Sequence, residues 1–310
     1  MAPHAKHRAP RTGARWRLLV GAALSGALVV GLLVGPELRW WDAARPPVPV
    51  AQAADPVTWP LREGPPVPPV RPVDATTVLR GVDAAAGAVA GSVAAVVVDP
   101  FGRVLLATPD ADRPLPSASL VKLLVVQQLL ARTSPAGWDA ITLRRMERAI
   151  TVSDDGAMSF LWGAYDGPAL VQAAVAQFGL TGTGPPAEVG QWGEATTTAS
   201  DVARFLSALA ASETAADSAT LLGWMRALAP TAVDGFDQTF GLLSGVAGAG
   251  VAAKQGWMCC VDGRRQVHSV GLLADGRVVV VLGDAPAGTT WARVIAAVDA
   301  ATEVLVAGTG

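Results

Sequence analysis

The pattern of hydrophobic and polar positions indicates where folded structure begins in this chain of 310 residues. Asp74 suits the N-cap of a helix that ends at Gly87, because aspartate accepts the free N–H groups of a first helical turn and glycine commonly ends a helix. The run of β-branched residues and alanine at 92–98 predicts a strand. Residues 99–102 then predict a turn, and residues 104–107 the returning strand of a hairpin.

Helical patterns dominate the middle of the chain, and strand patterns return near its end. A mostly helical stretch covers residues 119–228. Strand patterns follow at 250–253, 266–273 and 277–282, before a closing helix at 290–306. Helices between two groups of strands predict an α+β fold, in which both ends of the domain form one antiparallel sheet and a helical part is inserted between them.

An uncharged segment precedes this predicted domain. Residues 18–36 contain no charged side chain, and a helix of that length spans roughly 28 Å, close to the hydrocarbon thickness of a bilayer. Basic residues up to Arg17 come before it, and Trp40 and Trp41 come after it. The positive-inside rule therefore predicts a transmembrane anchor with a cytoplasmic tail, residues 1–17, and with the rest of the chain outside the cytoplasm.

A cleaved signal peptide is the alternative to this anchor. The best small-x-small cleavage site is Ala51-Gln52-Ala53, which lies too far beyond the apolar run, and no lipobox cysteine follows that run. The spacing favours an uncleaved single-pass anchor in the cell membrane. Residues 37–72 are proline-rich and predict an extended spacer, which leaves residues 73–310 as the folded extracytoplasmic domain.

Composition excludes some functions. The net charge is -2 and no long basic run lies beyond the N-terminus, so nothing supports nucleic-acid binding. The predicted domain contains one histidine, His268, and the chain has two cysteines, Cys259 and Cys260. These are too few ligands for a zinc site, and we expect no metal and no cofactor. The adjacent cysteines could form a vicinal disulfide or pair with another chain, but we favour core residues on a strand behind Lys254.

Ser119 and Lys122 are the first candidate chemical group. They are three residues apart at the start of an apolar helical run, which places their side chains on one face of the helix. A serine hydroxyl becomes a good nucleophile only when a base takes its proton, and a lysine can do so only if its pKa is depressed. The alternative is a serine that caps the helix beside an ordinary lysine.

Two further clusters, Ser153-Asp154-Asp155 and Lys254-Gln255-Gly256, follow in the sequence. A second serine that faces Ser119 could relay a proton to a leaving group, although serine before two aspartates is also a common N-cap. Lys254 at a strand end supplies positive charge for a substrate carboxylate, and Gly256 permits close backbone approach. The alternative for Lys254 is an ordinary surface lysine.

The ordered set of clusters resembles the class A β-lactamases and the penicillin-binding D,D-peptidases, whose signatures are S-x-x-K, S-D-N and K-T-G. The likeness extends to residues 94–106, which resemble the opening hairpin of that fold, and to residues 147–155, which resemble the approach to its second motif. Residues 196–201 resemble its Thr-Thr-containing helix start. The resemblance implies a β-lactamase-like domain with an antiparallel sheet from both chain ends.

The resemblance also implies a role for each matching residue. Ser119 would be the nucleophile, Lys122 its proton acceptor, Ser153 the proton shuttle, and Lys254 the electrostatic partner of a substrate carboxylate. The backbone N–H groups of Ser119 and Trp257 would match the oxyanion hole. The substrate side of the site would also include Asp155, Gln255, Gly256 and Trp257.

Several residues depart from the family pattern. Asp155 stands where the family has asparagine, and a carboxylate beside Lys122 would favour the charged amine. Gln255 replaces a threonine. Class A enzymes hold a deacylating glutamate in a long omega loop, and Glu188 is the candidate here, with Glu194 as the other. Only residues 189–195 separate Glu188 from Thr196, so that loop is shortened.

Two functions are therefore expected from the sequence. The first is a membrane-anchored serine hydrolase, acylated at Ser119 by a β-lactam or a cell-wall peptide amide. The second is a binding or scaffold protein of the cell envelope that has this fold and little turnover. The intact nucleophile and lysines favour the first, whereas Asp155, Gln255 and the shortened loop favour the second.

Overall fold

The computed structural model describes residues 73–310. The predicted cytoplasmic tail, transmembrane anchor and proline-rich spacer lie outside the described residues. Within residues 73–310, every helix is too short or too polar to cross a bilayer.

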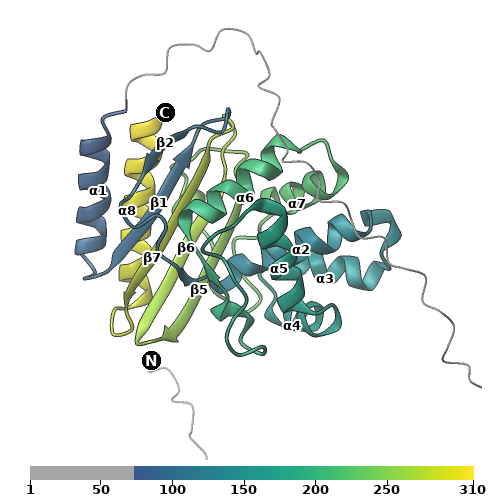
Figure 1. The fold of residues 1–310 in the computed structure, drawn as a ribbon. Helices are drawn as coiled ribbons and strands as arrows, with labels where there is room; N and C mark the ends of the chain where they lie inside the picture. Colours follow the sequence, from purple (N-terminus) through teal and green to yellow (C-terminus); the bar gives the residue numbers. More distant parts are fainter. Residues whose placement is uncertain (1–72) are drawn as a thin grey trace, which may run out of the picture. The chain divides into compact units, whose positions relative to one another are not determined.

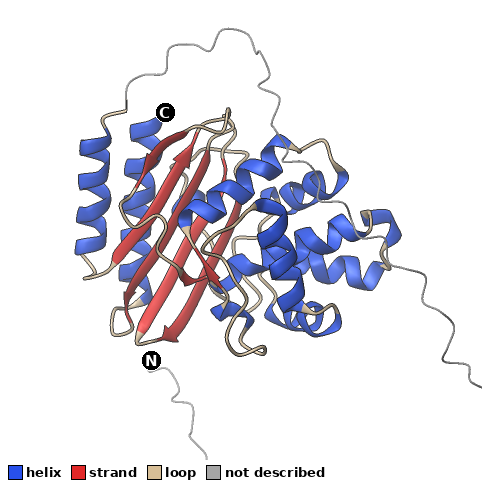
Figure 2. Ribbon diagram, viewed as in Figure 1, coloured by secondary structure: helices blue, strands red, loops and turns tan. Residues whose placement is uncertain are grey.

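A five-stranded antiparallel sheet forms the centre of the described domain (Figures 1 and 2). Its strand order is β2-β1-β7-β6-β5, so a strand from the start of the domain pairs with one from its end. This confirms the sheet predicted from both chain ends. The strands are β1 (Ser92–Val98), β2 (Val104–Ala107), β5 (Ala252–Val261), β6 (Arg264–Leu272) and β7 (Val278–Pro286).

Helices cover both faces of this sheet (Figure 1). The first and last helices, α1 (Ala75–Gly87) and α8 (Trp291–Thr309), lie together on one face. The inserted helical part lies on the other face and comprises α2 (Val121–Arg132), α3 (Ala140–Thr151), α4 (Asp155–Ala164), α5 (Gly167–Phe178), α6 (Ala199–Ala211) and α7 (Ala216–Arg226).

The hydrophobic core is divided by the sheet into two layers. Successive residues of β1 alternate between them: Ala94 and Val96 belong to the layer under the helical insertion, whereas Ala95 and Val97 belong to the layer under α1 and α8. Side chains of a strand point to opposite faces in turn, and here both faces are buried. That is why the strand is an unbroken apolar run in the sequence.

Local signals predicted the first described helix correctly. Asp74 is the N-cap of α1, and its carboxylate accepts a hydrogen bond from the backbone N–H of Thr77 at 3.1 Å. The confirmed helix ends at Gly87, as its sequence predicted.

The predicted end of the strand at 250–253 is wrong. Strand β5 continues to Val261, so Lys254 pairs with Val270 and Trp257 pairs with Val267 inside the sheet. Lys254 is therefore not at a strand end, and Trp257 also lies within the strand. Polar residues interrupt the apolar run in the sequence, but the backbone hydrogen bonds to β6 continue through them.

We expect burial to decide the stability effect of truncating two isoleucines of α3. Ile150 is fully buried and Ile141 is 64% exposed on the same helix. Ile150→Ala should lower the free energy of unfolding by about 2–5 kcal/mol, because it removes buried methyl groups and leaves a cavity. The matched control Ile141→Ala should change it by less than about 0.5 kcal/mol. Urea denaturation measures both, and equal effects would contradict the packing described here.

Candidate active site

Ser119 lies in a short 3-10 turn, η1 (Ala118–Leu120), which runs directly into α2. The backbone at Ala118 has a φ of 48°, in the left-handed region that a residue with a Cβ seldom adopts. The turn is held from the side by Ser117, whose backbone N–H donates to the carbonyl of Ala195 at 2.7 Å. Strain of this kind persists only where surrounding contacts fix the chain, as they do here.

Strands β5 and β6 also contact the turn that carries Ser119. The buried His268 on β6 donates a hydrogen bond from Nε2 to the carbonyl oxygen of Pro116 at 2.9 Å. Its register partner Gly256 lies so close to the turn that an added Cβ would be 3.4 Å from the Ser117 oxygen. Strand β5 thus passes in van der Waals contact with the turn at Gly256, and His268 is a positioning residue that the sequence did not indicate.

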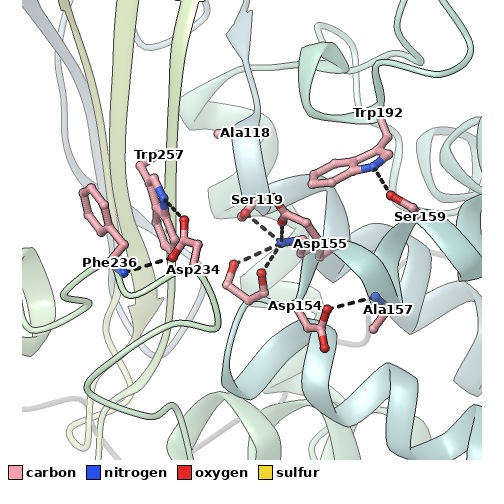
Figure 3. A network of polar contacts seen from close by, with 12 residues as sticks. Ala118, Ser119, Asp154, Asp155, Ala157, Ser159, Trp192, Asp234, Phe236 and Trp257 are labelled. Carbon is pink, nitrogen blue, oxygen red and sulfur yellow. Dashed lines mark hydrogen bonds and ion pairs between the residues drawn. The ribbon is translucent and has the colours of Figure 1, made fainter. Parts of the chain in front are cut away.

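Lys122 is at the centre of the site. Its side chain is fully buried, and Nζ lies 2.9 Å from Ser119 Oγ and 3.1 Å from Ser153 Oγ. Nζ also donates to the Ser153 carbonyl at 2.8 Å and to Asp155 Oδ1 at 2.6 Å. Figure 3 shows these dashed contacts converging beside Ser119 and Asp155. The amine thus joins residues that are more than 30 positions apart in the sequence.

Two opposing effects act on this amine. Burial lowers the pKa of Lys122, and the negative charge of Asp155 raises it, with burial the larger effect. The predicted contact between the Asp155 carboxylate and the lysine is therefore present. The net direction nevertheless favours the neutral amine more than in a solvated lysine, and a neutral amine can accept a proton.

Ser153 lies between two lysines. Its backbone φ is 50°, and its Oγ accepts hydrogen bonds from Lys122 at 3.1 Å and from Lys254 at 3.0 Å. The N-cap of α4 is Asp154, whose carboxylate accepts from the N–H of Ala157 at 3.0 Å. Ser153 is therefore not the helix cap, and its hydroxyl is directed to the two amines.

Lys254 is fully buried behind Ser153. Its Nζ donates to Ser153 Oγ and, at 2.7 Å, to the backbone carbonyl of Gln255. Burial lowers the pKa of Lys254 well below its ordinary value, and the neighbouring Lys122 lowers it further. The amine is close to the reacting hydroxyls but does not line the surface of the cavity.

A cavity of about 330 Å³ opens beside Ser119, between the helical insertion and the edge strand β5. Trp192 and Trp257 form parts of its wall, and the Trp192 indole N–H donates to Ser159 Oγ at 3.2 Å (Figure 3). The lining residues are Ala118, Ser119, Asp155, Ser159, Gly190, Gln191, Trp192, Gly193, Trp257 and Met258.

Gln255 and both candidate glutamates do not line this cavity. The Gln255 side chain is fully buried and donates from Nε2 to the carbonyls of Gln238 at 3.0 Å and Phe240 at 2.6 Å. Its amide thus fixes a neighbouring loop instead of replacing a substrate-binding threonine. The Glu188 side chain is exposed and is not among the lining residues. Glu194 is half-buried and is likewise absent from the lining.

Asp234 belongs to the surroundings of the site but gave no signal in the sequence. Its Oδ2 accepts a hydrogen bond from Trp257 Nε1 at 3.2 Å, and Trp257 also stacks on Phe236 with ring centroids 4.5 Å apart (Figure 3). Asp234 lies in an exposed loop more than 20 residues from Trp257, and only the fold brings the two together.

The preferred interpretation of the two cysteines is wrong. Cys259 and Cys260 are joined by a disulfide, and both are exposed instead of packed in the core. The vicinal disulfide was the alternative interpretation. Strand β5 runs beyond the core after Met258, which is why both cysteines reach the surface. Among residues 73–310, no group of three or more metal-ligating side chains occurs.

The fold is that of the β-lactamases. A β-lactamase from Chitinophaga pinensis DSM 2588 matches with a TM-score of 0.60 at 13% identity, over 76% of this chain and 100% of that chain. A β-lactamase from Sphaerobacter thermophilus DSM 20745 matches with a TM-score of 0.59 at 19% identity, over 77% of this chain and 98% of that chain. A class A β-lactamase from Bacteroides cellulosilyticus DSM 14838 gives 0.60 at 14% identity, over 77% and 99%. These matches confirm the β-lactamase-like fold that the motifs implied.

A curated relative has a similar sequence. The putative lipoprotein LppW of Mycobacterium tuberculosis (strain ATCC 25618 / H37Rv) is 29% identical over 187 residues. The LppW protein of Mycobacterium bovis gives the same values. The match spans 57% of this chain and 58% of the relative, which is less than two thirds of its length. No protein-family model matches the chain.

The buried His268 predicts a pH-dependent stability. Burial lowers its pKa to about 4 from 6.5, and its Nδ1 has no hydrogen-bond partner among the described residues. The unfolded chain therefore binds a proton that the folded protein excludes, so stability is lost as the pH falls from about 6.5 to about 4. The loss attributable to His268 should reach about 3 kcal/mol, measured by urea denaturation at several pH values.

The matched control is His268→Gln, because the glutamine amide can keep a donor near Pro116 without titrating. The difference in unfolding free energy between the two proteins should change across this pH range. A difference that stays constant would contradict the neutral, buried state of His268.

Proposed function

We propose that this protein is a serine hydrolase or acyl-transferring enzyme of the β-lactamase and D,D-peptidase type. Ser119 would be acylated by a β-lactam or by a cell-wall peptide amide, without a metal or cofactor. The observation that carries the proposal is the buried Lys122 amine, which contacts both Ser119 Oγ at 2.9 Å and Ser153 Oγ at 3.1 Å. A lysine with a lowered pKa is the base that this nucleophile requires.

The proposed acylation moves one proton along these contacts. Ser119 Oγ attacks the carbonyl carbon of the amide while its proton passes to the neutral amine of Lys122. The C–N bond then breaks, and the leaving nitrogen takes a proton from the Ser153 hydroxyl. Lys122 returns its proton to Ser153, which restores both groups and leaves an ester on Ser119.

Charge develops on the carbonyl oxygen during this step. We assign the backbone N–H groups of Ser119 and Trp257 to the oxyanion hole, and Lys254 to the electrostatic support of Ser153. Strand β5 contacts the nucleophile turn at Gly256. Asp155 and Trp257 would contact the substrate, because both line the cavity.

We also propose that the enzyme works at the cell envelope. The predicted anchor at residues 18–36 would cross the cell membrane once, with residues 1–17 in the cytoplasm and the catalytic domain outside. The lipoprotein name of the curated relative supports attachment to a membrane. The two cysteines of this chain are Cys259 and Cys260, so a helix and not an N-terminal lipid would provide the attachment.

A binding protein with little turnover is the second candidate function. It is favoured by the 2.6 Å ion pair between Lys122 and Asp155, which stabilises the charged amine and opposes its action as a base. The exposed position of Glu188, away from the cavity, favours it as well. The two candidates differ in whether Ser119 forms a covalent bond.

Covalent labelling separates them. Full-length protein incubated with a fluorescent penicillin should retain the dye after denaturing electrophoresis, because the β-lactam ring opens onto Ser119 Oγ. Ser119→Ala should abolish the label, since no hydroxyl remains. Ser117→Ala, which removes a neighbouring buried hydroxyl, is the matched control and should still be labelled. Absence of label from wild-type protein with several β-lactams would favour the binding protein.

The persistence of the label reports on deacylation. We expect a long-lived acyl-enzyme, because the described cavity contains no glutamate that could activate a water molecule beside Ser119. Glu188→Gln should therefore change the rate of label loss by less than about twofold. Mass spectrometry of the intact protein over time measures this rate. A clearly slower loss in the variant than in wild type would identify Glu188 as the deacylating base.

A further inference from the structure

The candidate cavity has an unusual distribution of charge. Among its lining residues, Asp155 is the only one with a charged side chain, and that side chain is 68% exposed. One carboxylate oxygen, Oδ1, contacts Lys122 Nζ at 2.6 Å. Within residues 73–310, the other oxygen, Oδ2, accepts no hydrogen bond. A ligand in the cavity would therefore meet a carboxylate with one free oxygen.

The two lysine amines of the site lie beneath that surface. Lys122 and Lys254 are both fully buried, and their Nζ atoms donate to protein oxygens. No arginine or other lysine lines the cavity in the described part of the chain. An anionic substituent in the cavity would thus have no exposed cation to pair with.

The cavity walls add to this preference. The Trp192 ring centroid lies 5.0 Å from Lys122 Nζ, and the Trp257 ring centroid lies 5.8 Å from Lys254 Nζ, so each indole faces one of the two buried amines. The faces of aromatic rings attract positive charge. Asp234 accepts a hydrogen bond from the Trp257 indole N–H and so places a second carboxylate beside Trp257 (Figure 3).

We infer that Asp155 makes this site selective for acyl donors that carry an ammonium group next to the reacting amide, over donors that carry a carboxylate there. The inference rests on the proposed acylation of Ser119. The ammonium group would bind Oδ2 of Asp155, with the tryptophan faces beside it. This assigns a substrate class to the cavity, namely amides whose acyl side carries a cationic substituent.

The same contact would activate the nucleophile. Asp155 raises the pKa of Lys122 through its negative charge. A substrate ammonium group paired with Asp155 offsets that charge, which leaves Lys122 more readily neutral and a better base for Ser119. A cationic substrate would therefore increase the rate of the chemical step as well as the affinity.

Penicillins with a common nucleus test the inference. Ampicillin carries an α-ammonium group, benzylpenicillin carries hydrogen at that carbon, and carbenicillin carries a carboxylate. Acylation of full-length protein, followed by mass spectrometry of the intact chain, should be fastest with ampicillin and slowest with carbenicillin. Each step should be about fivefold, the size of one exposed ion pair.

The Asp155→Asn variant removes the charge and keeps the shape. Benzylpenicillin should acylate this variant faster than it acylates wild type. The rates at which ampicillin and carbenicillin acylate the variant should be closer to each other than they are for wild type. This comparison also corrects for the different intrinsic reactivities of the three compounds. Glu147→Gln makes the same change of charge at an exposed position outside the cavity, and should keep the wild-type order. Thermal unfolding verifies that both variants are folded.

The possible outcomes are distinct. Equal rates for the three compounds, or carbenicillin fastest, would overturn the inference and leave the proposed function intact. An Asp155→Asn variant that keeps the wild-type order would assign the selectivity to another residue and also overturn it. Absence of acylation by all three compounds would overturn the proposed function and this inference with it.

Discussion

The burial of one amine is the constraint on which the rest of the site depends. Lys122 Nζ has no exposure to solvent, and a buried amine needs polar partners on every side. The partners come from three parts of the chain: Ser119 from the turn before α2, Ser153 from the loop after α3, and Asp155 from the start of α4. Because each partner lies within 3.1 Å of the amine, the turns that carry them must be held closely. The left-handed backbone at Ser153 and the hydrogen bond from His268 to the nucleophile turn are parts of that support.

The division of the core by the sheet explains where the cavity lies. One face of the sheet is covered by α1 and α8, and the other by the inserted helices. Strand β5 is at the edge of the sheet, so its outer side remains free to meet the nucleophile turn. The reactive groups therefore collect at the boundary between the helical part and the sheet, where Lys254 and Gly256 can approach Ser153 and Ser117 closely.

Two opposing effects act on the proton affinity of Lys122. Burial favours the neutral amine, and Asp155 favours the charged one. A site with burial alone would keep its base neutral in the absence of substrate. Because the Asp155 carboxylate lies 2.6 Å from Lys122 Nζ, the proton affinity of Lys122 depends on which other group pairs with Asp155. The proposed hydrolase rests on the effect of burial, whereas the proposed preference for cationic donors follows from the coupling to Asp155.

Local patterns in the sequence predict the order of the main helices and strands and the helix cap at Asp74. The candidate set of Ser119, Lys122, Ser153 and Lys254 rests on short clusters whose order resembles the β-lactamase motifs. The tertiary structure alone decided which side chains reach the cavity. Gln255 follows Lys254 by one residue, yet it points to the opposite face of β5 and bonds to a loop. Glu188 was the expected deacylating glutamate, but its side chain lies on the surface. Cys259 and Cys260 were expected in the core, but both are exposed and joined by a disulfide. In a strand with both faces buried, polar and apolar residues show no alternation, so the direction of each side chain is fixed only by strand register and by the partners across the sheet.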